Sequence, residues 1–261
     1  MGKVISVFSS KGGVSKSFLS SYLAFGISKI NPKAKVLVID FCKNSHIALE
    51  FGSKEITNST FDWYTKKKPL YECIYQFMNS NLYYIPSTQE VDQLQEWTTK
   101  KKRIGRENYL KNELIEELKE NFDYTIFDNH PSENDEKALY NVLAADGVVL
   151  ATVCELKSML STLEDIDLMR ELQEDIDTKL LVSLNRVDKT RGDLKFVEQF
   201  REMLFEKGVK EEEILPAIRY SNALNKQTIY SMAKVKNFDN QYIFNVLDDV
   251  FKFSEEVIKR V

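Results

Sequence analysis

The strongest constraint on the fold is the alternation of short apolar runs with amphipathic segments along the chain. We expect a strand in each of six apolar runs: Lys3–Phe8, Val36–Asp40, Leu82–Ile85, Asp123–Asp128, Gly147–Val153 and Lys179–Leu184. The last two are almost wholly apolar, which is typical of strands covered on both faces, as in a parallel sheet. Helical spacing of apolar residues recurs between the runs: about Lys16–Ile30, Tyr109–Leu118, Leu156–Leu172 and Phe196–Phe205. The alternation predicts an α/β fold, with a doubly wound, mostly parallel sheet flanked by helices.

The composition is that of a globular protein, and its charge is nearly balanced. Of the 261 residues, 43% are hydrophobic and 29% are charged, which excludes a disordered chain. The 36 basic residues face 40 acidic ones, for a net charge of -4. This balance argues against a protein whose whole surface binds nucleic acid, but it leaves a local basic face open. No break in composition marks a boundary, so we expect residues 1–261 to form a single domain.

Neither an export signal nor a membrane span is predicted. The apolar run at the start of the chain is far too short for a signal peptide, and no later stretch could span a bilayer. Cys42, Cys73 and Cys154 are scattered and lack the paired spacing of metal ligands. The two histidines, His46 and His130, are isolated in the sequence and predict no metal site. We therefore expect a cytoplasmic protein with reduced thiols.

A turn of small residues joins the first predicted strand to the first predicted helix. It consists of Ser9, Ser10, Lys11, Gly12, Gly13, Val14, Ser15, Lys16 and Ser17. A strand, loop and helix in this order point backbone N–H groups and a helix N-terminus at an anion. Lys16 would reach the terminal phosphates of a nucleotide, and the Ser17 hydroxyl would coordinate Mg²⁺. The usual P-loop pattern is broken, because Ser10 and Ser15 stand where it has glycines.

Lys11 supplies a second signal in this turn. It precedes the two glycines and lies five residues before Lys16, which fits the deviant Walker A motif Lys-Gly-Gly-x-x-Lys-Ser/Thr. Here the sequence resembles the ParA/MinD family of P-loop ATPases, which includes the nitrogenase iron protein. Segments that begin at Val36, Phe122, Ala145 and Leu180 extend the resemblance along most of the chain.

The resemblance implies an ATP-dependent homodimer with Mg²⁺ as a second cofactor. It implies that Lys11 crosses the dimer to the partner's nucleotide, as a catalytic and nucleotide-binding residue. The residues expected to bind the nucleotide phosphates are those of the turn: Lys11, Gly12, Gly13, Val14, Ser15, Lys16 and Ser17.

Asp128 and Asn185 come at the ends of predicted strands, at the edge of the sheet where the turn lies. A carboxylate at the position of Asp128 can hold Mg²⁺, and Pro131 and Ser132 beyond it are similar to the family's switch II segment. Asn185 matches the position that hydrogen-bonds adenine in the family, since an amide presents a donor and an acceptor together. An ordinary turn asparagine explains Asn185 equally well, and both interpretations stay open.

The sequence departs from the family after the second strand. The family usually has two aspartates two residues apart, the first near the metal and the second orienting the attacking water. This chain has Asp40, a candidate catalytic residue, but Cys42 in the second position. A thiol with an ordinary pKa of about 8.5 is mostly neutral at physiological pH and replaces a carboxylate poorly. With Ser15 in place of a glycine, this predicts ATP binding with slow or absent intrinsic hydrolysis.

Members of the family change their affinity for a surface when ATP joins two copies. In partition proteins the surface is nonspecific DNA, and a centromere-binding, ParB-like partner stimulates hydrolysis. In MinD-like proteins it is the membrane, bound through an amphipathic C-terminal helix. The tail Tyr242–Val261 has helical spacing but acidic residues on its polar side, so we expect a packed helix there. The sequence favours a ParA-like partition switch over a non-hydrolysing scaffold or a MinD-like protein.

The basic residues predict a DNA-contacting surface only weakly. A run of charged residues usually forms part of a solvated surface, and this is what we expect here. The alternative is a patch that contacts nucleic-acid phosphates. The candidates are Lys66–Lys68, Lys100–Arg103, Arg186, Lys189, Arg191, Arg219, Lys226, Lys234 and Lys236.

Overall fold

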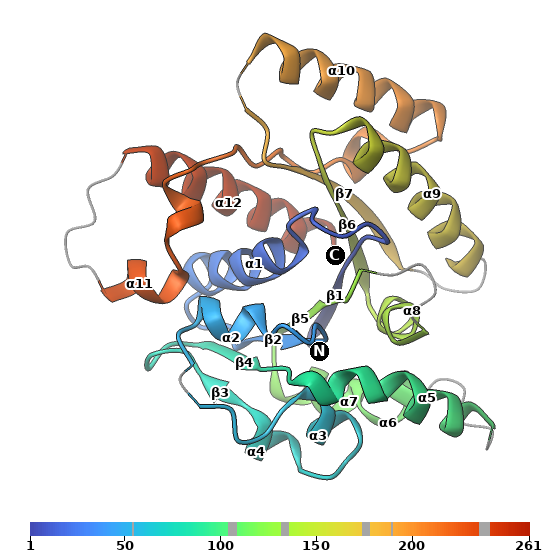
Figure 1. Ribbon diagram of the computed structural model, residues 1–261, viewed down its shortest axis with the longest axis vertical. Coiled ribbons are helices and arrows are strands. Elements are labelled where there is room, and N and C mark those ends of the chain that lie inside the picture. Colours follow the sequence, from blue (N-terminus) through green and yellow to red (C-terminus); the bar gives the residue numbers. More distant parts are fainter. Residues whose placement is uncertain (54, 104–108, 132–135, 174–177, 189, 235–240) are drawn as a thin grey trace.

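The computed structural model describes the chain except for residues 54, 104–108, 132–135, 174–177, 189 and 235–240 (Figure 1). Within the described residues, seven strands form one sheet in the order β3-β4-β2-β5-β1-β6-β7. The strands are β1 (Lys3–Phe8), β2 (Val36–Asp40), β3 (Tyr75–Gln76), β4 (Leu82–Ile85), β5 (Tyr124–Asp128), β6 (Gly147–Val153) and β7 (Lys179–Asn185). Every neighbouring pair is parallel except β3 and β4. The predicted α/β architecture with a mostly parallel sheet is confirmed.

Helices of very different lengths connect the strands. They are α1 (Lys16–Ile30), α2 (His46–Glu50), α3 (Thr60–Tyr64), α4 (Leu70–Cys73), α5 (Leu94–Arg103), α6 (Tyr109–Glu113), α7 (Ile115–Asn121), α8 (Glu136–Leu143), α9 (Leu156–Gln173), α10 (Arg191–Glu206), α11 (Ile229–Lys234) and α12 (Gln241–Arg260). Short 3-10 turns lie at η1 (Gln89–Gln93), η2 (Glu211–Glu213) and η3 (Leu224–Lys226). α1 ends one residue before the Asn31-Pro32 pair, because a residue that precedes proline disfavours the helical conformation.

Helices cover both faces of the sheet, and the alternation of side chains along each strand shows how. In β2, Val36 and Val38 belong to the apolar cluster that α1 and α12 form on one face. Leu37 and Ile39 belong to the cluster on the other face, with α3 and α5 to α7. β2 is buried along its whole length, which explains its continuous apolar sequence. Farther along that second face, α8, α9 and α10 pack against β6 and β7.

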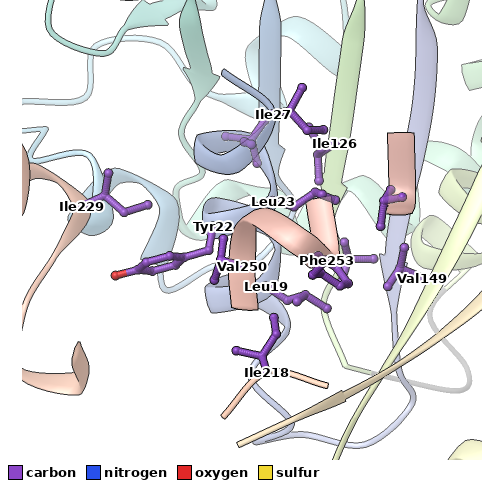
Figure 2. Close-up of a cluster of buried hydrophobic side chains, with 14 of the residues drawn as sticks. Leu19, Tyr22, Leu23, Ile27, Ile126, Val149, Ile218, Ile229, Val250 and Phe253 are labelled. Atoms are coloured by element: carbon purple, nitrogen blue, oxygen red, sulfur yellow. The ribbon is translucent and has the colours of Figure 1, made fainter. Parts of the chain in front are cut away.

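Helices α1 and α12 lie side by side although they come from opposite ends of the chain (Figure 1). Figure 2 shows Leu19 and Leu23 of α1 among Val250 and Phe253 of α12, all of them buried. Burying side chains of this size stabilises the fold by about 1.5–3 kcal/mol each. The C-terminal segment is therefore a helix packed into the core, as the sequence predicts. Among the described residues, no helix is long and apolar enough to cross a membrane.

Two predicted strands and three predicted helices differ in detail. α10 begins at Arg191, before the predicted Phe196, and ends one residue late, at Glu206, and α9 ends one residue late, at Gln173. β5 begins one residue later than expected, at Tyr124, and β7 extends one residue further, to Asn185. The predicted helix Tyr109–Leu118 is two helices, interrupted at Leu114, whose backbone has φ of −123°. Leu114 is buried with apolar residues on both sides of the break, so the spacing of apolar residues runs through it. Periodicity alone therefore could not reveal this break.

Candidate nucleotide site

The turn between β1 and α1 contains two residues with left-handed backbone. Gly13 has φ of 82°, and a side chain added there would meet no atom within 4 Å. Ser15, the residue before α1, has φ of 67° and makes no side-chain capping hydrogen bond within the described structure. A residue with a Cβ is strained in this conformation, which glycine adopts freely. At Ser15 the chain therefore keeps the left-handed backbone that suits glycine, and the serine makes this conformation strained.

Lys16 folds back into the turn. Its Nζ donates hydrogen bonds to the carbonyl oxygens of Ser9, at 3.0 Å, and Lys11, at 2.8 Å. The side chain is buried, and loss of solvation lowers the pKa of its ammonium to about 8, opposed by the negative charge of Asp128. The turn thus holds a buried ammonium whose described partners are two neutral carbonyl groups. A nearby anion would stabilise its charged form.

Lys11 contacts the first turns of α9. Its Nζ donates a hydrogen bond of 2.7 Å to the Ser158 hydroxyl and lies 3.6 Å from the Glu155 carboxylate. The preceding residue, Ser10, donates its backbone N–H to Asp165 of the same helix at 3.1 Å. The polar side of α9 therefore packs against the turn and holds Lys11 on its own chain.

Asp40, Cys42 and Asp128 meet beside the turn. Asp40 and Asp128 are register partners at the ends of the parallel strands β2 and β5. One ligand atom from each of the three side chains lies within 4.8 Å of the other two. Both aspartates are fully buried and Cys42 is 8% exposed. Loss of solvation raises the pKa of both carboxyls and of the Cys42 thiol, and the negative charge of Asp128 adds to the shift at the other two groups.

The two carboxylates differ in their hydrogen bonds. The oxygens of Asp40 accept the backbone N–H of Cys42 at 2.7 Å and of Ile47 at 3.2 Å. Asp40 thereby fixes the loop that carries Cys42. One oxygen of Asp128 accepts the Ser20 hydroxyl at 3.0 Å, and the other, Oδ2, is buried without a partner among the described residues. Of these carboxylate oxygens, Oδ2 of Asp128 is therefore the one most available to a ligand.

A cleft of about 410 Å³ opens over this cluster. Its walls come from the turn, from the loop after β2 and from the segment after β5. Ser17 lines it and lies close enough to Asp128 and Cys42 to influence the pKa of both. His46 and His130 line it too, so the fold brings both histidines to one place. No spacing in the sequence indicates this, because the two loops meet only when β2 and β5 pair. Ser132 lies outside the described residues.

Asn185 ends β7 at the same edge of the sheet. Its side chain is fully buried, its oxygen accepts the Ser183 hydroxyl at 3.2 Å, and its Nδ2 has no partner within the described structure. The next residue, Arg186, places its guanidinium 5.4 Å from the centre of the Tyr220 ring. A small cavity of about 140 Å³ lies between this pair and Ser15 of the turn. Asn185 thus keeps an unpaired buried donor beside Arg186, which shares a cavity with the turn.

Three side chains that the sequence analysis did not single out support the site. Ser20 holds Asp128 from one turn beyond Lys16, a spacing that puts both residues on one face of α1. Asn129 donates to Ser6, at 2.8 Å, and accepts from Asn141, at 2.7 Å, which ties the end of β5 to β1 and α8. The spacing of Ser20 from Lys16 could have indicated its role from the sequence alone. The asparagine pair joins separate elements of the fold, so no pattern in the sequence could indicate it.

The described basic residues are largely engaged within the chain. Lys66 pairs with Glu113 at 2.9 Å, Lys68 pairs with Glu72 at 3.0 Å, and Lys67 lies 4.2 Å from the Phe61 ring centre. These contacts favour the predicted solvated surface for the first lysine cluster.

Two of the later candidates are engaged as well. The Arg219 guanidinium forms a two-point contact with Asp249 at 2.5 and 2.7 Å. Lys234 lies 4.2 Å from the Tyr230 ring centre. Several candidates lie outside the described residues, wholly or in their side chains: Lys101, Lys102, Arg103, Lys189, Arg191 and Lys236.

A strand, a turn with left-handed residues and a helix, with a buried lysine in the turn and acidic residues at the next strand ends, define a P-loop protein. A family model described as an AAA domain matches residues 2–182. The chain belongs to this family, in its ParA/MinD branch of P-loop ATPases.

Three known proteins show the range of similar chains. The sporulation initiation inhibitor protein Soj of Bacillus subtilis is 26% identical over 216 residues, which cover 80% of this chain and 83% of Soj. The ATP complex of a substituted Cyanothece McdA superimposes with a TM-score of 0.78 at 20% identity, covering 100% and 97% of the two chains. A protein of Borrelia burgdorferi B31 assigned to plasmid partition, bound to AMPPNP, has a TM-score of 0.74 at 22% identity, with both chains covered completely. At these identities the two structures show the shared fold.

Proposed function

We propose that this protein is a ParA-like, ATP-binding switch for the partition of plasmid or chromosomal DNA. The observation that carries the proposal is the turn itself. It buries the Lys16 ammonium against carbonyl groups and places Lys11 beside it. Similarity to Soj and to the plasmid partition structure supports partition as the role.

The site fits a nucleotide with magnesium. Gly13 is open to the backbone approach of phosphates, and the buried Lys16 lacks an anionic hydrogen-bond partner among the described residues. The unpaired Oδ2 of Asp128 and the Ser17 hydroxyl in the cleft suit a hard cation. Bound Mg²⁺ would neutralise phosphate charge. The proposed holding residues are Lys11, Gly12, Gly13, Val14, Ser15, Lys16 and Ser17 for the phosphates, Asn185 for the base, and Ser17 and Asp128 for the cation.

The switch would work through dimerisation. To reach the nucleotide of a second copy, Lys11 has to leave Ser158 and Glu155 of its own chain. A dimer presents two copies of each exposed basic residue, so that contacts too weak in a monomer can retain DNA together. A ParB-like, centromere-binding protein would be the second partner and would stimulate hydrolysis. We infer a cytoplasmic protein whose residues 1–261 form a single ATPase domain.

Cys42 supports a second candidate function, a non-hydrolysing ATP-dependent scaffold. Loss of solvation, together with the negative charges of Asp128 and Asp40, raises the pKa of the buried thiol and keeps it neutral. A neutral thiol is a weak base for orienting an attacking water. Asp40 is also a candidate catalytic residue, and its carboxylate already accepts hydrogen bonds from two backbone N–H groups. Slow intrinsic hydrolysis is expected in both functions, and stimulation by a partner distinguishes them.

A MinD-like role at the membrane has less support. The apolar side of α12 is packed against α1, with Val246, Val250 and Phe253 buried. A membrane-surface helix needs its apolar side free to enter the lipid.

The test is retention on nonspecific DNA with ATP and with ADP. We expect retention with ATP only, weakening steeply as salt is raised, because phosphate contacts release counterions. Lys16→Ala is the control and should abolish the retention seen with ATP. Binding to anionic vesicles in place of DNA would contradict the proposal. Phosphate release is then measured with and without the product of the adjacent gene. Stimulation supports partition, and tight ATP retention without stimulation supports the scaffold.

A further inference from the structure

We propose that Asp40, Cys42 and Asp128 form a binding site for a thiophilic divalent cation of the zinc class. Their ligand atoms lie within 4.8 Å of one another, and the cluster is the one such group of histidine, cysteine and acidic side chains within the described part of the chain. A sulfur and two carboxylate oxygens are ligands that Zn²⁺ takes in proteins. The site is distinct in its ligand chemistry from the magnesium of the proposed function, which has no use for Cys42.

The unpaired atom of Asp128 points to a ligand independently of the cluster's composition. Asp128 is fully buried, and its Oδ2 makes no hydrogen bond of full geometry with the described residues, although the Ser17 hydroxyl and the Lys16 ammonium lie near enough to oppose the rise in the pKa of this carboxyl that burial causes. A buried polar atom without a partner destabilises the fold, and more so when it carries charge. A bound cation would remove this destabilisation.

The other hydrogen bonds of the cluster hold its ligands in place. Asp40 accepts two backbone N–H groups, from Cys42 and Ile47, and Ser20 donates to Oδ1 of Asp128. A carboxylate has about four acceptor positions, so each carboxylate can still bind a cation. Hydrogen bonds of this kind orient metal ligands. The cluster is therefore arranged before an ion arrives.

Cys42 is the member of the cluster that lines the cleft, so an ion and a water as fourth ligand would enter on the Cys42 side. Cys42 lines the cleft of about 410 Å³, together with Ser17, His46 and His130. Both histidines stay outside the group whose atoms lie within 4.8 Å, so they are not ligands in this conformation. Three protein ligands with a fourth position open to water are typical of zinc sites that exchange a ligand.

The thiol decides which cation is preferred. Sulfur favours Zn²⁺ and Co²⁺, whereas Mg²⁺ takes oxygen ligands and retained water. When the ion binds, the S–H bond of Cys42 breaks, a sulfur–metal bond forms and the proton goes to solvent. Asp128 belongs to this site and to the proposed magnesium site, so the two cations would compete for it. Because cation binding needs no nucleotide, failure of this proposal and failure of the proposed function are distinguishable.

The experiment uses the nucleotide-free, full-length protein and Co²⁺ as a spectroscopic probe. One equivalent of Co²⁺ should produce a sulfur-to-cobalt charge-transfer band in the near ultraviolet. An equivalent of Zn²⁺ should remove the band, and a large excess of Mg²⁺ should not. Cys42→Ser should lose the band, and Asp128→Asn should bind Co²⁺ at least about tenfold more weakly. Cys154→Ser is the matched control and should keep the band, because Cys154 lies outside the cluster.

Thermal melting keeps the test decisive where a variant folds poorly. A cation that binds the folded state raises the melting temperature. Zn²⁺ should therefore raise it for the unsubstituted protein and for Cys154→Ser, but not for Cys42→Ser. The proposal is overturned if the unsubstituted protein shows no charge-transfer band with saturating Co²⁺. A band of full intensity in Cys42→Ser would overturn it as well.

Discussion

Lys11 donates a hydrogen bond of 2.7 Å from its ammonium to the hydroxyl of Ser158, at the start of α9. This contact keeps the lysine of the deviant Walker A motif on its own chain. In the proposed function, dimerisation has to break it. A hydrogen bond to a charged group contributes about 1.5–3 kcal/mol, and less when the group is partly exposed, as Lys11 is. We expect Ser158→Ala to strengthen ATP-dependent dimerisation by roughly 3- to 10-fold, measured by analytical ultracentrifugation.

Ser161→Ala is the matched control for this prediction. Ser161 lies on the same side of α9 and bonds the Ser10 hydroxyl at 3.0 Å, without touching Lys11 in any described contact. Its removal should leave dimerisation almost unchanged. Equal dimerisation of Ser158→Ala and the unsubstituted protein would show that the contact does not hold Lys11 back.

Ser15 predicts a stabilising substitution. Its left-handed backbone, φ of 67°, is strained for a residue with a Cβ. Glycine removes a strain of about 1–2 kcal/mol and gives back about 0.4–1 kcal/mol through the greater freedom of the unfolded chain. Ser15→Gly should therefore raise the free energy of unfolding by up to about 1.5 kcal/mol, measured by urea denaturation. Ser15→Ala keeps the strain and should gain nothing. A less stable glycine variant would contradict this account.

The sequence predicted the sheet well because its strands are defined locally. β1, β2 and β6 are mostly apolar and are buried except at Lys3, and each appears with the expected bounds. The short strand β3 escaped prediction, because two residues, Tyr75 and Gln76, carry no periodicity. It forms by pairing antiparallel with β4 at the edge of the sheet.

The candidate site was only partly visible in the sequence. Lys16 and the two glycines were found because a P-loop is contiguous in sequence. That His46 and His130 line one cleft could not be seen, since the contact depends on the pairing of β2 with β5. The position of Lys11 against α9 likewise depends on tertiary packing, because Ser158 is 147 residues away.

Lys16 predicts proton uptake when the nucleotide binds. Loss of solvation lowers the pKa of the free protein's Lys16 to about 8, and phosphates would raise it again. Above this pKa the free protein has largely lost the proton, so binding has to take one up, and affinity falls as pH rises. Calorimetry with AMPPNP at about pH 8.5, in two buffers of different ionisation enthalpy, should show uptake of a large part of one proton.

The same shift predicts how stability depends on pH. Below about pH 8 Lys16 is protonated in both the folded and the unfolded chain, and its burial penalty is fully present. As pH rises from about 8 towards 10.5, the folded chain loses the proton first, so this penalty disappears and the Lys16 contribution to stability rises. Lys16→Met should lose both this dependence and the proton uptake. If Lys16→Met takes up as much of a proton on AMPPNP binding as the unsubstituted protein does, the proton binds to another group.

The Arg219–Asp249 pair predicts a loss of stability that could be mistaken for a DNA-binding defect. The guanidinium contacts both carboxylate oxygens and joins the segment after β7 to α12, and both side chains are mostly buried. We expect Arg219→Ala to lower the free energy of unfolding by about 1–3 kcal/mol, measured by urea denaturation. Asp249→Ala should cost a similar amount, although it removes no positive charge. DNA retention at a temperature where both variants are folded should be equal in the two. A selective loss in Arg219→Ala would make this residue a DNA contact.

Cys42→Asp should couple stability to magnesium and restore hydrolysis. The new carboxylate would lie beside Asp40 and Asp128, which are both fully buried. Without a cation, repulsion and burial of a third acid should lower the free energy of unfolding by about 2–4 kcal/mol. Magnesium should recover most of this loss, because it binds the folded state of an all-oxygen site. With ATP and Mg²⁺, phosphate release should then exceed that of the unsubstituted protein, since a carboxylate can orient the attacking water. Cys42→Ser, which adds no charge, is the control and should show neither effect. If Cys42→Asp gains no phosphate release with or without the partner, the thiol is not what limits hydrolysis.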